Sequence, residues 1–208
     1  MEDPHAIAVA PGAAPAAPGP LTADQQSELA DAGRRARKAT GAAKVAAFNG
    51  WCTAVFAGLC APFAAFSLTA LVLGLGLGVI AYNEFRGRRL IRAFDLRGPR
   101  LLGWNQVGLM ALVVLYSVAQ LHAGLTGPNP YAAQLSAEPQ LAEMLGPIED
   151  LQRLLVLAVY GTVVALTILF QGANAVYYFT RAKHIRNYLA QTPGWVVELQ
   201  RHVTASAA

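Results

Sequence analysis

The side chains best placed to do chemistry in this chain are amides that lie in or near long apolar segments. Asn105 and Gln106 lie near the start of one such segment, and Gln171 and Asn174 lie toward the end of another. Polar groups are costly in lipid, so those in membrane segments either hydrogen-bond between helices or mark a functional site. We expect the two pairs to lie at one level and to form interhelical hydrogen bonds. A polar permeation or substrate site is the alternative.

Catalytic and metal-binding patterns are missing from the sequence. It contains no nucleophile elbow, no phosphate-binding loop and no zinc-protease helix. Its two cysteines, Cys52 and Cys60, would be separated by roughly 12 Å of rise on one helix. That separation exceeds the ~7 Å between Cα atoms that a disulfide tolerates. We therefore expect no enzyme activity, no catalytic or cofactor-binding residue, and no metal site.

Glycines in the segment Leu73-Gly-Leu-Gly-Leu-Gly78 form a pattern typical of membrane helix packing. Gly74 and Gly78 are four residues apart and share one helix face, whereas Gly76 lies off that face. Small residues on one face let a neighbouring helix approach closely. We expect Gly74 and Gly78 to pack against another span of the same chain, with homo-oligomerisation through this face as the alternative.

A cluster of arginines follows that segment, in a predicted basic loop at 84–100. Arg86, Arg88, Arg89 and Arg92 are the candidates for contact with anionic lipid, since each cation near a membrane surface contributes about 1 kcal/mol. The simpler interpretation is a loop that only sets the topology. Nucleic acid is not an expected partner, because the loop is too short to leave the membrane surface.

The segments that would position these residues are mostly long runs without charged side chains. Of the 208 residues, 55% are hydrophobic and 13% are charged, whereas soluble domains carry about a quarter charged residues. The first block, 45–83, is too long for one span of ~20 residues. Pro62 is the natural break, because proline cannot donate to a helix ladder. Two spans in a tight hairpin are expected, with one kinked helix as the alternative.

The sequence predicts an all-α integral membrane protein with four transmembrane helices arranged as two hairpins. Its expected parts are a disordered Ala/Pro-rich tail at 1–20, a cytoplasmic amphipathic basic helix at 21–44, a transmembrane domain at 45–180 and a cytoplasmic interfacial tail at 181–208. Within the transmembrane domain, the spans are expected at about 45–62, 65–83, 101–121 and 154–178, with the basic cytoplasmic loop at 84–100 and an acidic extracytoplasmic loop at 122–150.

The positions of the sixteen Lys and Arg residues predict the orientation. Five precede the first span, six lie in the loop at 84–100, four follow the last span, and only Arg153 belongs to the other side. Cytoplasmic segments carry this excess of cations, so both termini are expected in the cytoplasm. The bias favours a multi-pass protein of a bacterial plasma (inner) membrane.

These features favour a structural or accessory role in the membrane. Such a protein would act through helix packing and its cytoplasmic basic segments, with membrane lipids and a membrane-protein partner or a second copy as its contacts. The alternative is an oligomeric small-solute transporter or channel. The sequence carries no acid and no Lys at the centre of a predicted span, which disfavours proton-coupled transport.

Overall fold

The computed structural model describes residues 21–127, 137 and 148–206, and the elements in these ranges are helices. They are α1 (Ala23–Ala64), α2 (Leu68–Arg92), α3 (Arg97–Thr126), α6 (Ile148–Gln191) and α7 (Gly194–Ser206). The first four are long and apolar enough to cross a membrane, which confirms the predicted helical class and supports a multi-pass membrane protein. The predicted disordered tail at 1–20 and most of the predicted acidic loop at 122–150 lie outside the described residues.

Helix α1 joins two elements that the sequence analysis separates, the basic helix at 21–44 and the span at 45–62. The structure has one continuous helix of 42 residues, because the alanine-rich junction contains no residue that stops a helix. Its start is a capping box, in which Thr22 Oγ1 accepts the backbone N–H of Gln25 at 3.2 Å. The Gln25 side chain accepts the Thr22 N–H in return at 3.0 Å.

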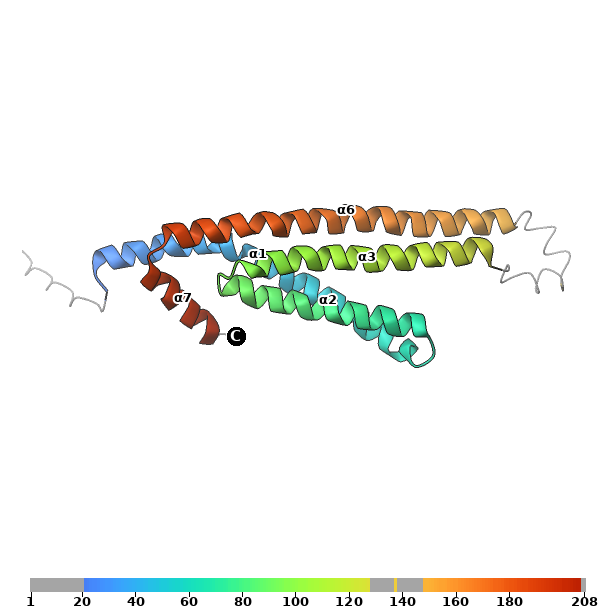
Figure 1. The fold of residues 1–208 in the computed structure, drawn as a ribbon, viewed down its shortest axis with the longest axis horizontal. Helices are drawn as coiled ribbons and strands as arrows, with labels where there is room; N and C mark the ends of the chain where they lie inside the picture. The colour runs from blue at the N-terminus through green and yellow to red at the C-terminus, as the bar shows by residue number, and fades with distance from the viewer. Residues whose placement is uncertain (1–20, 128–136, 138–147, 207–208) are drawn as a thin grey trace, which may run out of the picture.

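The break after α1 comes close to the predicted position. The helix continues past Pro62 to Ala64, and α2 begins at Leu68 with the Ser67 hydroxyl accepting the Ala70 N–H at 3.3 Å. Helices α1 and α2 then pack along each other (Figure 1). The alternative of one kinked helix over 45–83 is therefore not what the structure contains.

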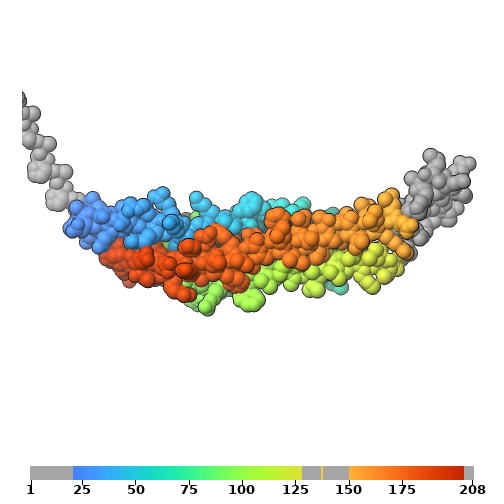
Figure 2. Space-filling model, turned by 90° about the horizontal axis from the view of Figure 1, so that it is seen from above, coloured from blue at the N-terminus to red at the C-terminus, as the bar shows by residue number. Residues whose placement is uncertain are grey.

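The helices form two pairs, because α1 packs along α2 and α3 packs along α6 (Figure 1). Helix α6 runs along almost the whole described bundle, beside α1 at one end and α3 at the other (Figure 2). We call the end that contains 23–44, the α2–α3 connection and 181–186 the basic end. The far end contains the α1–α2 turn and Arg153.

The hydrophobic core lies at the basic end rather than at the middle of the predicted spans. Alanines of α1 allow α6 to approach closely, and α7 folds back so that Val197 completes the cluster. The core consists of Ala39, Ala42, Ala43, Ala46, Ile91, Phe94, Leu102, Tyr178, Ile185, Tyr188 and Val197. This arrangement ties all five helices together at one end.

The predicted basic loop at 84–100 is mostly helical. Helix α2 continues to Arg92, and only 93–96 separate it from α3. Phe94 has a positive φ of 55°, and the Phe94 and Asp95 N–H groups donate to the Ile91 and Leu90 carbonyls at 3.0 and 2.9 Å. This is the Schellman ending that usually takes glycine at the left-handed position. Here the Phe94 ring is buried and stacks on Tyr188, with the ring centroids 4.4 Å apart.

Candidate functional site

Glu84 is a completely buried acid within α2, with 0% of its surface exposed. From the sequence, Glu84 is expected in the basic loop at 84–100, and it is not among the predicted functional residues. It belongs instead to a buried stripe of α2 at helical spacing, which consists of Leu77, Ile80, Ala81, Glu84, Gly87 and Ile91. The helical spacing of the buried residues continues past Asn83, and this continuation in the sequence would have identified Glu84 as a buried residue.

Three other helices supply the polar groups around the Glu84 carboxyl group of α2. Asn105 Nδ2 and Gln106 Nε2, both on α3, donate to Glu84 Oε1 at 2.8 and 2.7 Å. The Tyr178 hydroxyl on α6 donates to Oε2 at 3.5 Å, and Asn49 Nδ2 on α1 donates to that hydroxyl at 3.3 Å. We call Asn49, Glu84, Asn105, Gln106 and Tyr178 the carboxylate cluster. It joins α1, α2, α3 and α6 at one level.

The carboxylate cluster has no cation within the part of the chain that the structure describes. The ion pairs found there are Arg34–Asp31 and Arg97–Asp95, and both lie away from Glu84. The hydrogen bonds to Glu84 come from amides and a phenol, which are neutral donors. Burial without a cation disfavours the ionised form of an acid, so a positive group that approached this position would stabilise the carboxylate.

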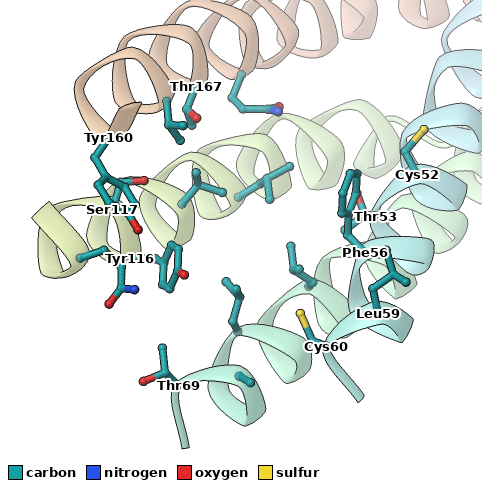
Figure 3. A pocket seen from close by; sticks show the side chains of 18 of the residues that line it. Cys52, Thr53, Phe56, Leu59, Cys60, Thr69, Tyr116, Ser117, Tyr160 and Thr167 are labelled. Atoms are coloured by element: carbon teal, nitrogen blue, oxygen red, sulfur yellow. The ribbon is translucent and has the colours of Figure 1, made fainter. Parts of the chain in front are cut away.

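A cleft of about 850 Å³ lies between the two helix pairs, and all four long helices line it (Figure 3). Figure 3 shows Cys52, Phe56 and Cys60 of α1 on one side, across from Ser117 of α3 and Thr167 of α6. The lining extends from Asn49 and Gln106, which belong to the carboxylate cluster, to Ser67 and Gln120 toward the far end. The cleft is within the range of about 300–1,000 Å³ that small-molecule sites occupy.

Three polar atoms of cleft-lining residues have no hydrogen-bond partner among the described residues. They are Gln106 Oε1, Ser117 Oγ and Gln171 Oε1. Gln106 and Ser117 are each only 1% exposed. The Gln106 NH₂ group donates to Glu84 Oε1, and the Gln106 amide oxygen is left without a partner among the described residues.

The four predicted interhelical amides do not pair as expected. Asn105 and Gln106 bond between helices, but their partner is Glu84 of α2, and Asn105 also donates to the Ile80 carbonyl at 3.0 Å. In the described part of the chain, Gln171 and Asn174 form no hydrogen bond with α3. The NH₂ groups of Asn105 and Gln106 are instead directed at the Glu84 carboxyl group.

The predicted helix-packing glycines differ in their surroundings. A Cβ at Gly74 would lie 3.1 Å from Cys60 Cβ on α1, whereas one at Gly78 would meet no atom within 4 Å. Tighter approaches occur elsewhere. A side chain at Gly87 would overlap Leu102 of α3, and a Cβ at Gly103 would lie 2.6 Å from the Phe179 ring of α6.

The four candidate lipid-contact arginines lie on the last two turns of α2. Arg86 and Arg89 are exposed, and Arg88 and Arg92 are half-buried. None of them forms an ion pair within the described ranges. Their guanidinium groups are therefore available to an external anion. All four arginines lie close together along the chain, just before the α2–α3 connection.

No protein-family model, curated protein or solved structure matches this chain. In the described residues there is no group of three His, Cys, Asp or Glu side chains that could hold a metal ion.

Proposed function

We propose that this chain is an accessory protein of a bacterial plasma membrane, with four spans in two hairpins and both termini in the cytoplasm. The observation that carries the proposal is the contrast between the two ends of the bundle. The core and all Lys and Arg residues except Arg153 lie at the basic end, while the spans bury little. Of the most apolar stretch of 18 residues in each helix, only 6% is buried in α3 and 0% in α6.

A closed four-helix bundle buries an inner stripe on every helix, so these spans leave faces for other membrane components. The proposed partner is another membrane protein, which packs against the spans while the arginines of α2 hold anionic lipid headgroups. Cations gathered at one end support the orientation, because cytoplasmic flanks carry the excess of Lys and Arg.

Native mass spectrometry of the protein extracted gently from its own membranes tests this proposal. A reproducible complex with a different membrane protein is the expected result. The protein recovered only as a single chain, under conditions that preserve known complexes of the same membrane, would contradict it.

The topology needs a separate test. A reporter fused within 122–150 is expected outside the cytoplasm, and one fused after Arg186 is expected inside. If both reporters lie on one side, the four-span arrangement is wrong.

A second candidate function is an oligomeric small-solute transporter, and the cleft is the observation that favours it. The cleft reaches the carboxylate cluster at one end and continues toward the far end between the helix pairs. A closed homo-oligomer in the native mass spectrum, followed by solute flux in liposomes, would support this candidate over the first. An oligomer without flux would contradict it.

A further inference from the structure

We propose that the cleft holds one acyl chain of phosphatidylethanolamine, with the phosphate of this lipid at Arg153 and its ammonium at Asp150. Such a lipid site goes beyond the accessory role, but it rests on the proposed four-span arrangement, which places the far end of the bundle at a membrane surface. Three features support it: the size and walls of the cleft, the α6 face that lines it, and two opposite charges at the end of that face.

The walls and the size of the cleft fit an acyl chain. Its apolar lining includes Phe56 and Leu59 of α1, Leu73 of α2, and Leu109 and Val113 of α3. A helix with its side chains is about 10–12 Å wide, so even 15 Å of it would fill roughly 1,200–1,700 Å³. The cleft has about 850 Å³, which is too small for a partner's helix. A single acyl chain is much thinner and can enter it.

One face of α6 connects the cleft to the far end of the bundle. Tyr160, Val163 and Thr167 line the cleft, and Tyr160 and Thr167 are seven residues apart (Figure 3). Seven residues are close to two helical turns, so Arg153, seven residues before Tyr160, lies on the same face. Arg153 comes directly before the uncharged block that starts at Leu154. This position places Arg153 at the level of the lipid headgroups.

The depth of the cleft below Arg153 matches one leaflet of a bilayer. Half of a hydrocarbon core of ~30 Å is ~15 Å. At a rise of ~1.5 Å per residue, this depth corresponds to about ten residues of α6. Val163 is ten residues after Arg153. A lipid with its headgroup at Arg153 can therefore place an acyl chain against Tyr160 and Val163.

Asp150 and Arg153 present opposite charges at this end of α6. Both residues are exposed, and within the described ranges neither forms an ion pair. They are three residues apart, so their Cβ atoms are about 5–6 Å apart on neighbouring turns. A two-carbon bridge joins the phosphate and the ammonium of phosphatidylethanolamine, so one headgroup can reach both side chains. An anionic headgroup would meet Asp150 as a like charge, and a trimethylammonium group has no N–H to donate to it.

Native mass spectrometry of the full chain in neutral detergent tests the preference with three lipids that share the same acyl chains. They are phosphatidylethanolamine, phosphatidylglycerol and phosphatidylcholine. We expect the first to reach half-maximal retention at a concentration about tenfold lower than the other two, because only its headgroup forms charge-assisted hydrogen bonds with both Asp150 and Arg153. Equal retention of the three lipids would overturn the proposal, since it would mean that the headgroup is not recognised.

Variants of the two charged residues test the headgroup contacts. Arg153→Gln and Asp150→Asn are each expected to weaken retention of phosphatidylethanolamine about tenfold. Asp150→Asn removes a like charge, so it should retain phosphatidylglycerol at least as well as wild type does. Lys183→Gln is the matched control, because Lys183 is an exposed cation at the other end of α6. Wild-type retention of phosphatidylethanolamine in both charge variants would contradict the proposed contacts.

A tryptophan on α6 tests the position of the acyl chain. Val163 lines the cleft and Val159, one turn earlier, does not, although both side chains are exposed. Val163→Trp fills the cleft and should weaken retention of phosphatidylethanolamine at least about tenfold, whereas Val159→Trp should behave as wild type. Circular dichroism verifies the fold of each variant, and Thr167→Trp replaces Val163→Trp if the latter does not fold. Equal retention by the folded cleft variant and Val159→Trp would place the chain outside the cleft and overturn the proposal.

The reporter fusions within 122–150 and after Arg186 test the four-span arrangement separately. They report where each segment lies in the cell, whereas lipid retention is measured on the purified protein. Absence of the lipid preference together with the expected reporter positions would contradict the lipid site alone. Both reporters on one side would contradict the four-span arrangement, whatever lipid is retained.

Discussion

Gln106 Nε2 on α3 lies 2.7 Å from Glu84 Oε1 on α2, and both residues are buried to within 1% of their surface. This contact joins the two helix pairs, because α2 belongs to one pair and α3 to the other. The same amide turns its oxygen away from Glu84 as an unpaired atom of a cleft-lining residue. One side chain thus connects the bundle's internal polar contact with its cleft.

Truncating Glu84 should destabilise the protein strongly. Glu84→Ala leaves the NH₂ groups of Asn105 and Gln106 buried without their acceptor and opens space at the crossing, so we expect a loss of about 3–5 kcal/mol. Glu84→Gln keeps the shape and should cost less than half as much. Unfolding in SDS, followed by circular dichroism, measures both variants. Equal stability of wild type and Glu84→Ala would show that the contact does not hold α2 to α3.

Two glycines of α2 should respond in opposite ways to alanine. Gly87→Ala places a methyl group against Leu102, so we expect a loss of about 1–3 kcal/mol. Gly78→Ala meets open space, and alanine is the better helix former, so it should be neutral or stabilising by up to about 1 kcal/mol. Thermal unfolding in detergent compares the pair. The reverse order would contradict the crossing at Gly87 and would instead support close packing at Gly78.

Replacing Phe94 by glycine separates backbone strain from packing. Glycine removes a left-handed penalty of about 1 kcal/mol at φ 55°, but it also deletes the buried ring that stacks on Tyr188. Deleting a buried aromatic side chain costs about 3–5 kcal/mol, so we expect Phe94→Gly to be less stable than wild type. Increased stability on chemical unfolding would mean that the ring contributes little.

Asp95 should make a small, pH-dependent contribution at the start of α3. The Arg97 backbone N–H donates to Asp95 Oδ1 at 2.8 Å and lowers the pKa of this carboxyl below its ordinary value of 3.8. A lowered pKa in the folded state means that the ionised form stabilises the fold above pH 3.8, and that this contribution disappears as the pH falls through the folded pKa. Asp95→Asn should therefore be slightly less stable than wild type at pH 7. The difference should vanish in strong acid, and a difference that grows in acid would contradict this account.

The exposed arginines of α2 should retain anionic lipid. Arg86→Gln combined with Arg89→Gln removes two unpaired cations, each expected to contribute about 1 kcal/mol to binding of an anionic headgroup. Native mass spectrometry with added phosphatidylglycerol counts the lipids retained. Arg153→Gln at the far end is the control and should keep the wild-type number. Equal lipid retention in all three proteins would exclude a lipid role for the α2 arginines.

The sequence by itself determined the helical class and the presence of four apolar helices long enough to cross a membrane. These properties depend on runs of uncharged residues, and such runs are local. The position of the α1–α2 turn near Pro62 and the capping box at Thr22 are local in the same way. Each depends on residues within a few positions of one another, so a sequence pattern is sufficient to predict them.

The tertiary structure alone decided which polar groups meet. Asn105 and Gln106 were identifiable as amides near a span, but their acceptor, Glu84, lies 21 and 22 residues away on another helix. Glu84 is followed in the sequence by a cluster of arginines, so this charged residue was assigned to the loop. Its helical spacing from Ile80 and Gly87 nevertheless places it on the buried face of α2. Burial depends on which helix packs opposite a residue, and that neighbour is set by long-range packing rather than by local sequence.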